Sequence, residues 1–270
     1  MTETVAEETL ESAHGEAEAR SAGLVRNDHP ELDEALDPDF EPTFEVEADP
    51  ELETRDLHEA DEELEARERE GPAERGAFTP RSERTIPGMG GKVLDFRGTG
   101  LCPPNGGPMR PLAMVHHIPV VRNVAGTQDF ITLGNVLRAQ GLAIQAATDA
   151  EGNVALYTAF DRLCFGHRGA NQLACGVEHM HMTVGEPWAE KQMRAAAWCA
   201  AQVWIAHAVP PRGAVLTAGS PVVGVKRRGH TSHKMVSDLA GFHDRSDPGA
   251  GFNFAHMYEL ARFFREHRRF

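Results

Sequence analysis

The sequence predicts an α/β fold, in which a central mixed β-sheet is flanked by helices, preceded by an acidic N-terminal region without a fold of its own. From Leu112 onward, short apolar segments typical of strands alternate with longer segments that have helical spacing. That mixed order is typical of a sheet covered by helices. Two changes of composition before Leu112 divide the chain into residues 1–85, 86–111 and 112–270.

Residues 1–85 are dominated by Glu, Asp and Ala and are poor in aromatic side chains. Such a segment buries too little apolar surface to offset the entropy lost on ordering, so we expect it to be disordered. Leucines at helical spacing between residues 50 and 70 leave open a lone acidic helix. Gly and Pro are dense between residues 71 and 111, which predicts a linker over residues 86–111.

The charge of the 270-residue chain is unevenly distributed. Residues 1–86 hold 28 acidic and 8 basic side chains, a net of −20, and the remaining 13 acidic and 19 basic side chains give +6. A mildly basic body suits an anionic partner, such as a cell wall polymer, a nucleic acid or a lipid headgroup. The charge alone does not choose among these partners.

Targeting and redox signals are weak in this sequence. The first residues have neither a basic segment nor an apolar core, and no apolar run approaches the ~18 residues of a membrane span, so we expect no secretory signal and no transmembrane segment. The four cysteines lack paired spacing, which indicates neither a disulfide framework nor a zinc knuckle: Cys102, Cys164, Cys175 and Cys199.

The first half of the body should supply three strands and a helix. Leu112–Val120 is apolar around a His-His pair and predicts a buried strand. Thr127–Gln140 predicts a helix, because Thr-Gln-Asp opens it and Gly141 follows its end. The segments Ala143–Thr148 and Val154–Phe160 flank Asp-Ala-Glu-Gly-Asn, which predicts a hairpin with glycine in the turn.

The second half should add one strand and two helices. Residues 174–182 predict another strand. Ala189–Ala208 predicts a long amphipathic helix that ends before Pro210-Pro211, and Phe254–His267 carries apolar residues at helical spacing.

Histidines supply three candidate sources of metal ligands. The first is His116-His117, of which only one side chain can reach a given site, because adjacent strand residues face opposite sides. The second is the segment from His230 to Asp247, whose Asp-Pro-Gly end predicts a tight turn that orients a carboxylate. The third is His179-x-His181, which shares one strand face, whereas Glu178 lies on the other. The residues alone leave the choice open.

The order of motifs from about Leu112 to His267 resembles the type 2 N-acetylmuramoyl-L-alanine amidase family, which includes phage endolysins, cell wall recycling amidases and peptidoglycan recognition proteins. Each motif is weak alone, and the ordered set is more specific. The acidic region has no counterpart in that family. The motifs are Val-His-His-Ile at 115–118, the hairpin around Gly152, His167-Arg168-Gly169 with Asn171, Gly176-Val177-Glu178, and His233 with Asp247-Pro248-Gly249.

The resemblance implies a role for each matching residue. His116, His233 and Asp247 would be the ligands of a zinc ion, and Glu178 would be the general base. Arg245 stands where many members carry a lysine that stabilises the oxyanion, and His243 is a neighbouring alternative for that task. His167 and Asn171 match positions that line the substrate groove, although they could instead hold their loop.

The implied activity is zinc-dependent hydrolysis of the amide bond between N-acetylmuramic acid and L-alanine in peptidoglycan. We expect a monomer that binds no nucleic acid, is made in the host cytoplasm and acts on the bacterial wall as a phage endolysin. The alternatives are a peptidoglycan-binding module without catalysis, a cytoplasmic recycling amidase, a hydrolase built on His179-x-His181, or a functional role of the acidic region.

Overall fold

The computed structural model describes residues 78–119, 126–181 and 187–267. The expectations for residues 1–77, including the possible acidic helix, lie outside the described residues. Within the described residues, no helix has the length and apolar character needed to cross a membrane. The four cysteines are buried and free of disulfides.

A mixed seven-stranded sheet forms the centre of the described fold, with strands in the order β1-β2-β5-β4-β6-β3-β9. The β4–β6, β6–β3 and β3–β9 pairs are parallel, whereas β1–β2 and β4–β5 are antiparallel. The predicted α/β class is therefore confirmed. The strands are β1 (Ser82–Thr85), β2 (Lys92–Asp95), β3 (Ala113–His117), β4 (Ala146–Thr148), β5 (Val154–Leu156), β6 (Ala174–His179) and β9 (Gly229–Ser232).

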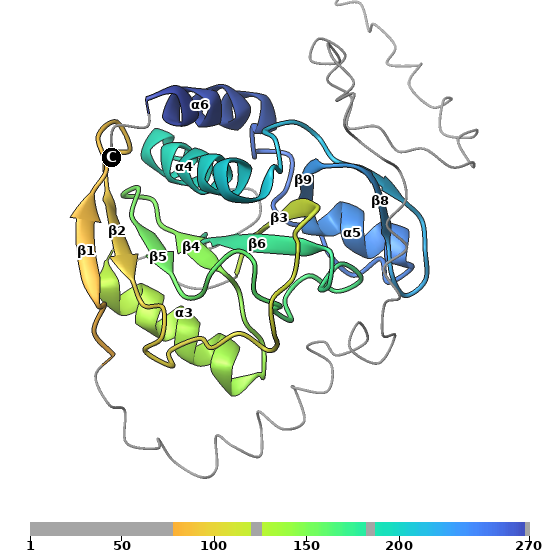
Figure 1. The fold of residues 1–270 in the computed structure, drawn as a ribbon, viewed down its shortest axis with the longest axis horizontal. Coiled ribbons are helices and arrows are strands. Elements are labelled where there is room, and N and C mark those ends of the chain that lie inside the picture. The colour runs from red at the N-terminus through yellow and green to blue at the C-terminus, as the bar shows by residue number, and fades with distance from the viewer. Residues whose placement is uncertain (1–77, 120–125, 182–186, 268–270) are drawn as a thin grey trace, which may run out of the picture.

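Helices cover both faces of this sheet (Figure 1). Helix α3 (Thr127–Ala139) packs on one face, where Phe130 and Leu133 join a core cluster with Met180. Helices α4 (Glu190–His207) and α6 (Phe254–Glu266) pack together on the other face, against side chains that include Met114 and Val177. All three helices were predicted, α3 from the signals at its two ends and α4 and α6 from apolar spacing, and their bounds agree to within a residue or two.

The predicted linker over residues 86–111 is wrong, as is disorder over the last residues of the 1–85 segment. Strand β2 pairs with β5 inside the sheet, and β1 pairs with β2. Buried apolar side chains hold this stretch against the body: Met89, Val93, Leu94, Phe96 and Leu101. Glycines fit such short connections because several of them adopt positive φ, as Gly88 does at 79°.

A second group of elements between Val215 and Ala240 was not predicted. Strands β7 (Val215–Thr217) and β8 (Gly224–Arg227) form a separate antiparallel pair. After β9, helix α5 (His233–Ala240) begins without an intervening loop and packs near β3 and β9 (Figure 1). These elements are only three to eight residues long, too short for a clear periodic pattern.

Candidate metal centre and active site

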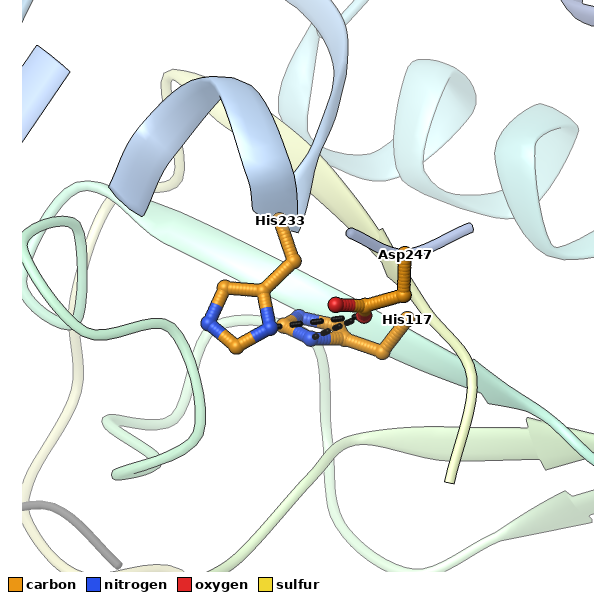
Figure 2. A group of neighbouring side chains, drawn as sticks. All are labelled: His117, His233 and Asp247. Atoms are coloured by element: carbon orange, nitrogen blue, oxygen red, sulfur yellow. Dashed lines mark ion pairs between the residues drawn. The ribbon is translucent and has the colours of Figure 1, made fainter. Parts of the chain in front are cut away.

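Three side chains from distant parts of the sequence converge at the carboxyl end of β3. His117 ends β3, His233 is the first residue of α5, and Asp247 lies in the loop before α6. One ligand atom from each lies within 4.8 Å of the others (Figure 2). Asp247 Oδ2 is 3.3 Å from His233 Nδ1 and 3.7 Å from His117 Nδ1. Two imidazoles and a carboxylate therefore face one point.

The chain fixes His233 through the start of its helix. Ser232 is the N-cap of α5, and its hydroxyl accepts a hydrogen bond from the Met235 backbone N–H at 3.1 Å. A serine cap satisfies one of the otherwise unpaired amide groups of the first turn. Because β9 pairs with β3 up to Ser232, the helix starts beside the end of β3 and brings His233 next to His117.

Backbone contacts hold Asp247 in place. The Ile118 N–H donates to Asp247 Oδ2 at 3.2 Å, and the Lys234 N–H donates to the Asp247 carbonyl at 3.0 Å. Gly249 closes the turn with φ of 79°, a conformation that glycine adopts without strain. The predicted Asp-Pro-Gly turn therefore orients the carboxylate toward both histidines.

The prediction that His116 is the first metal ligand is wrong, because the structure places His117 at this centre and His116 elsewhere. His116 faces the opposite side of β3, and both of its ring nitrogens are taken. Its Nδ1 lies 2.9 Å from His179 Nε2, and its Nε2 lies 3.0 Å from His230 Nδ1. Burial, with the neighbouring His179 and His230, lowers the pKa of His116 well below its usual value.

The His116 contacts belong to a row of hydrogen-bonded side chains that crosses four neighbouring strands. Thr148 on β4 lies 2.8 Å from His179 Nδ1, and His179 on β6 is followed by His116 on β3 and His230 on β9. His179 thus uses both ring nitrogens within the row, and His181 Nε2 contacts Gln192 at 2.8 Å. Among the described residues, His179-x-His181 is part of no three-ligand group.

Glu178 faces the candidate metal centre, where the family resemblance placed it, whereas its strand position alone left the choice between Glu178 and the His179-x-His181 pair open. It pairs in register with His117 across the parallel β6 and β3 strands, so the two side chains share a face. Burial raises the pKa of Glu178 well above its usual value, the Asp247 carboxylate raises it further, and Arg245 opposes them. Among the described residues, its Oε2 atom is buried without a hydrogen-bond partner. The carboxyl group is therefore suited to exchange a proton in the pocket.

A pocket of about 300 Å³ lies over the candidate metal centre and Glu178. Arg245 lies on its wall together with His117, His233, Asp247 and Glu178. The rest of the wall is mostly apolar and comes largely from α3 and the segment after β3: Ile118, Pro119, Leu133, Val136, Leu137, Leu142 and Ala143. A cation beside an apolar wall can stabilise negative charge in a poorly hydrated site.

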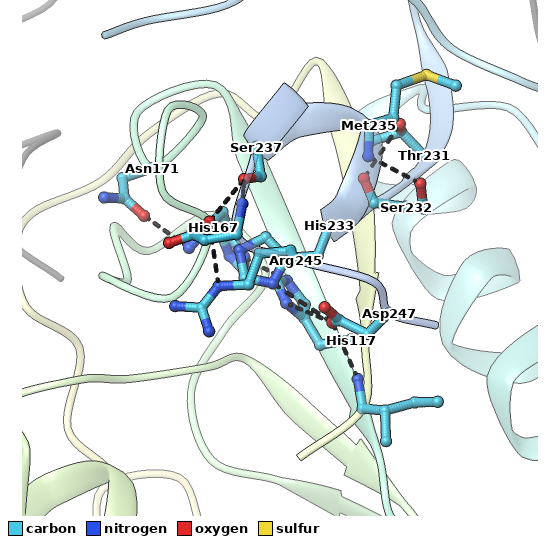
Figure 3. Close-up of polar contacts among 12 residues, drawn as sticks. His117, His167, Asn171, Thr231, Ser232, His233, Met235, Ser237, Arg245 and Asp247 are labelled. Atoms are coloured by element: carbon cyan, nitrogen blue, oxygen red, sulfur yellow. Dashed lines mark hydrogen bonds and ion pairs between the residues drawn. The ribbon is translucent and has the colours of Figure 1, made fainter. Parts of the chain in front are cut away.

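His167 and Asn171, which were expected at the substrate groove, do not line the pocket, and neither does His243. Figure 3 shows Asn171 beside His167. His167 is fully buried, and its Nδ1 contacts His117 Nε2 at 2.8 Å. Asn171 Oδ1 accepts hydrogen bonds from the backbone N–H groups of His167 and Gly166. This side chain therefore holds its loop, which was the alternative to a role in the groove. His243 is exposed and pairs with Asp238 at 3.4 Å, so it is not placed to stabilise an oxyanion.

The donor set fits a zinc ion with a free coordination position. Two imidazole nitrogens and one carboxylate oxygen are ligands that zinc accepts, and three protein ligands are typical of catalytic sites. A tetrahedral ion with bonds of about 2.0–2.1 Å separates its ligand atoms by roughly 3.3 Å, close to the observed spacing from Asp247 to His233. Burial lowers the pKa of His117 well below its usual value, which favours the neutral ring that a metal requires.

Comparison with known proteins places this centre in a family context. The family described as N-acetylmuramoyl-L-alanine amidase matches residues 109–250. No curated protein matches the chain in sequence. The match covers the segment that contains His117, Glu178, His233, Arg245 and Asp247.

Solved structures that resemble the chain include the hydrolase AmiA of Staphylococcus aureus in complex with its ligand, with 15% identity, a TM-score of 0.46, and coverage of 71% of this chain and 97% of that one. The endolysin LysCS from Clostridium intestinale has 14% identity, a TM-score of 0.41, and coverage of 57% and 85%. The Ph2119 endolysin from a Thermus scotoductus bacteriophage has 13% identity, a TM-score of 0.40, and coverage of 60% and 90%.

Proposed function

Because the chain belongs to the N-acetylmuramoyl-L-alanine amidase family, we propose that it is a zinc-dependent hydrolase of the amide bond between N-acetylmuramic acid and L-alanine in peptidoglycan. One observation carries the proposal: His117, His233 and Asp247 converge on one point in a pocket that Glu178 also lines. A module that only binds peptidoglycan would need neither three converging ligands nor a buried carboxyl group beside them.

The hydrolysis of an amide requires a better nucleophile than neutral water and a more reactive carbonyl. A zinc ion held by His117, His233 and Asp247 would lower the pKa of a water molecule to about 7 and polarise the amide carbonyl. The protein would contribute the geometry that holds the three ligand atoms together before substrate arrives. That preorganisation rests on the Ser232 cap and on the backbone donors to Asp247.

Glu178 would transfer the proton. Its carboxylate accepts a proton from the attacking water and later gives it to the amine nitrogen of L-alanine as the C–N bond breaks. A group that first accepts and then donates a proton works best when its pKa lies near the working pH. The raised pKa of Glu178 has this direction, since burial and Asp247 both favour the protonated form.

Arg245 would stabilise the negative charge that develops on the carbonyl oxygen. Its cation lies on the same wall as Glu178 and already affects the pKa of that residue. The loop that carries Arg245 is anchored because Asp244 accepts hydrogen bonds from Arg168 at 2.6 Å and from Ser237 at 2.7 Å. The apolar wall from α3 would exclude bulk water from the reacting groups.

The biological setting that we propose is that of a phage endolysin, made in the host cytoplasm and acting on the bacterial wall. A recycling amidase would use the same chemistry on soluble muropeptides. The rates of cleavage of intact walls and of soluble muropeptides distinguish these two roles. An endolysin should cleave intact walls, whereas a recycling amidase should prefer the soluble fragments.

The experiment that tests the reaction is mass spectrometry of purified peptidoglycan after digestion by the full chain loaded with zinc. We expect new L-alanine N-termini without new reducing sugars, and we expect a chelator to abolish them. New reducing ends, or cleavage inside the stem peptide, would show that a different bond is cut. Binding to the wall without any cleavage would favour the non-catalytic module.

A further inference from the structure

His167 lies directly behind His117, on the side of the ring opposite the metal centre. His117 Nδ1 faces Asp247 Oδ2, and His117 Nε2 lies 2.8 Å from His167 Nδ1. The two rings are 4.9 Å apart between centroids and tilted by 33°. One imidazole therefore contacts the candidate ligand group through one nitrogen and a buried histidine through the other.

The two contacts of His117 impose a proton arrangement. A ring nitrogen that binds a metal must carry no proton, so a neutral His117 that offers Nδ1 holds its proton on Nε2. That N–H donates to His167 Nδ1, which must then be the acceptor. We propose that His167 is a positioning residue, which fixes the tautomer and the ring orientation of His117 and thereby sets the affinity for the metal. This inference rests on the proposed function for the identity of the ion.

The surrounding chain is built to hold the His167 ring in that one place. The ring packs onto Gly176, where an added Cβ atom would lie only 2.1 Å from His167 Cε1 and 2.8 Å from Nδ1. Gly176 is itself fixed, since its N–H donates to Gln145 Oε1 at 2.7 Å. The backbone of His167 is held by Asn171 Oδ1 at 2.8 Å. Only a residue without a side chain at position 176 leaves room for this ring.

Packing alone does not account for an imidazole at position 167. The residue is fully buried, and its Nε2 atom has no hydrogen-bond partner among the described residues. A buried polar atom without a partner costs free energy that an apolar side chain would avoid. The polar contact that the ring does make, through Nδ1 to His117, is therefore the one that explains it.

Two substitutions of similar shape separate positioning from packing. Asn places an acceptor oxygen near the position of His167 Nδ1, whereas Leu offers none, so His167→Asn and His167→Leu differ mainly in the hydrogen bond. We expect His167→Leu to weaken zinc binding by ~10- to 100-fold, as the loss of such a contact behind a ligating histidine does elsewhere. His167→Asn should retain most of the affinity, and His256→Asn, a half-buried histidine paired with Glu190, is the matched control.

The measurements are competition titration with a zinc chelator and ¹⁵N NMR of the histidine rings in the metal-free full chain. In the unsubstituted protein we expect His117 with its proton on Nε2. Zinc affinity of His167→Leu within about twofold of the unsubstituted protein, or a His117 proton on Nδ1, would overturn the inference and leave the amidase proposal intact.

Should His167→Leu fail to fold, Gly176→Ala displaces the ring without removing it and should weaken zinc binding in the same direction. Unchanged zinc affinity in folded Gly176→Ala would count against positioning by His167. A chain that folds, shows the expected tautomer and yet cleaves no peptidoglycan would instead refute the proposed function alone. The NMR reading thus decides the two proposals separately.

Discussion

His116 and His117 are adjacent in β3 and serve opposite faces of the sheet. The ring of His117 lies with His233 and Asp247, whereas the ring of His116 lies between His179 and His230. The alternation of side chains along a strand produces this division. It determines which of two neighbouring histidines can hold a metal at the pocket.

Substitution of the two histidines should therefore have opposite effects on metal content. His117→Ala should reduce bound zinc from one ion per chain to almost none, because it removes a ligand. His116→Gln should keep the zinc but lower the free energy of unfolding by about 1–3 kcal/mol, because buried ring nitrogens of its neighbours lose a partner. Elemental analysis after dialysis, together with urea unfolding, checks both outcomes. Zinc loss confined to His116→Gln would contradict the placement.

Glu178→Gln should separate metal binding from turnover. The amide cannot accept the proton of the attacking water, so kcat should fall by ~10²–10⁴, while zinc content stays unchanged. Steady-state kinetics on a defined muropeptide and elemental analysis measure the two quantities. Retention of near-full activity would remove Glu178 from the proton transfer.

The same variant should stabilise the metal-free protein at neutral pH. The pKa of Glu178 is raised in the folded state, so the folded state holds a proton that the unfolded state releases above pH ~4.5, and stability falls as the pH rises through this window. A glutamine cannot ionise, so Glu178→Gln should lose this dependence. Urea unfolding with a chelator at pH 5 and pH 8 should show a gain for the variant that grows with pH.

Arg245→Ala should lower kcat by ~10²–10³ without loss of zinc, since it removes one donor to the developing oxyanion. Arg245→Lys keeps the cation but loses the forked guanidinium, so its kcat should lie between that of the unsubstituted protein and that of Arg245→Ala. Single-turnover kinetics under saturating substrate report this step. An equal loss in both variants would indicate that the fork, rather than the charge, is required.

The buried histidine row should make the metal-free protein sensitive to acid. Burial lowers the pKa of His230 to about 3. Between pH ~6.5 and pH ~3 the unfolded state therefore binds one more proton at this residue than the folded state does. Stability contributed by the neutral ring is thus present above pH ~6.5 and is lost as the pH falls, by about 1.4 kcal/mol per pH unit for one proton. His230→Gln should reduce that slope by about one proton in urea titrations from pH 7.5 to 5. An unchanged slope would show that His230 does not titrate on unfolding.

Apolar spacing and helix-end signals predicted α3, α4 and α6, whereas the short α5 was missed. Strand alternation showed only that Glu178 and the His179-x-His181 pair face opposite sides, and the family resemblance assigned Glu178 to the site. The sequence did not predict which of His116 and His117 lies at the site, because that depends on how β3 pairs with β6. Once Glu178 is placed at the site, the register partner on its face is His117, and that pairing joins residues distant in the sequence. Periodicity along one strand carries no information about register with another.

The first strands were missed for a related reason. Strands β1 and β2 are four residues each and lie among glycines and prolines, which locally favour a loop. The pairing of β2 with β5 stabilises them across some 60 residues of sequence. Tertiary contacts therefore override the local pattern here, as they also do for β9 and α5.

The most direct test of the metal centre is anomalous diffraction at the zinc edge from crystals of the full chain grown with zinc. We predict one peak bounded by His117 Nδ1, His233 Nδ1 and the Asp247 carboxylate, with the carboxyl group of Glu178 facing its free side. A peak among His116, His179 and His230, or no peak at a saturating zinc concentration, would contradict the proposed centre.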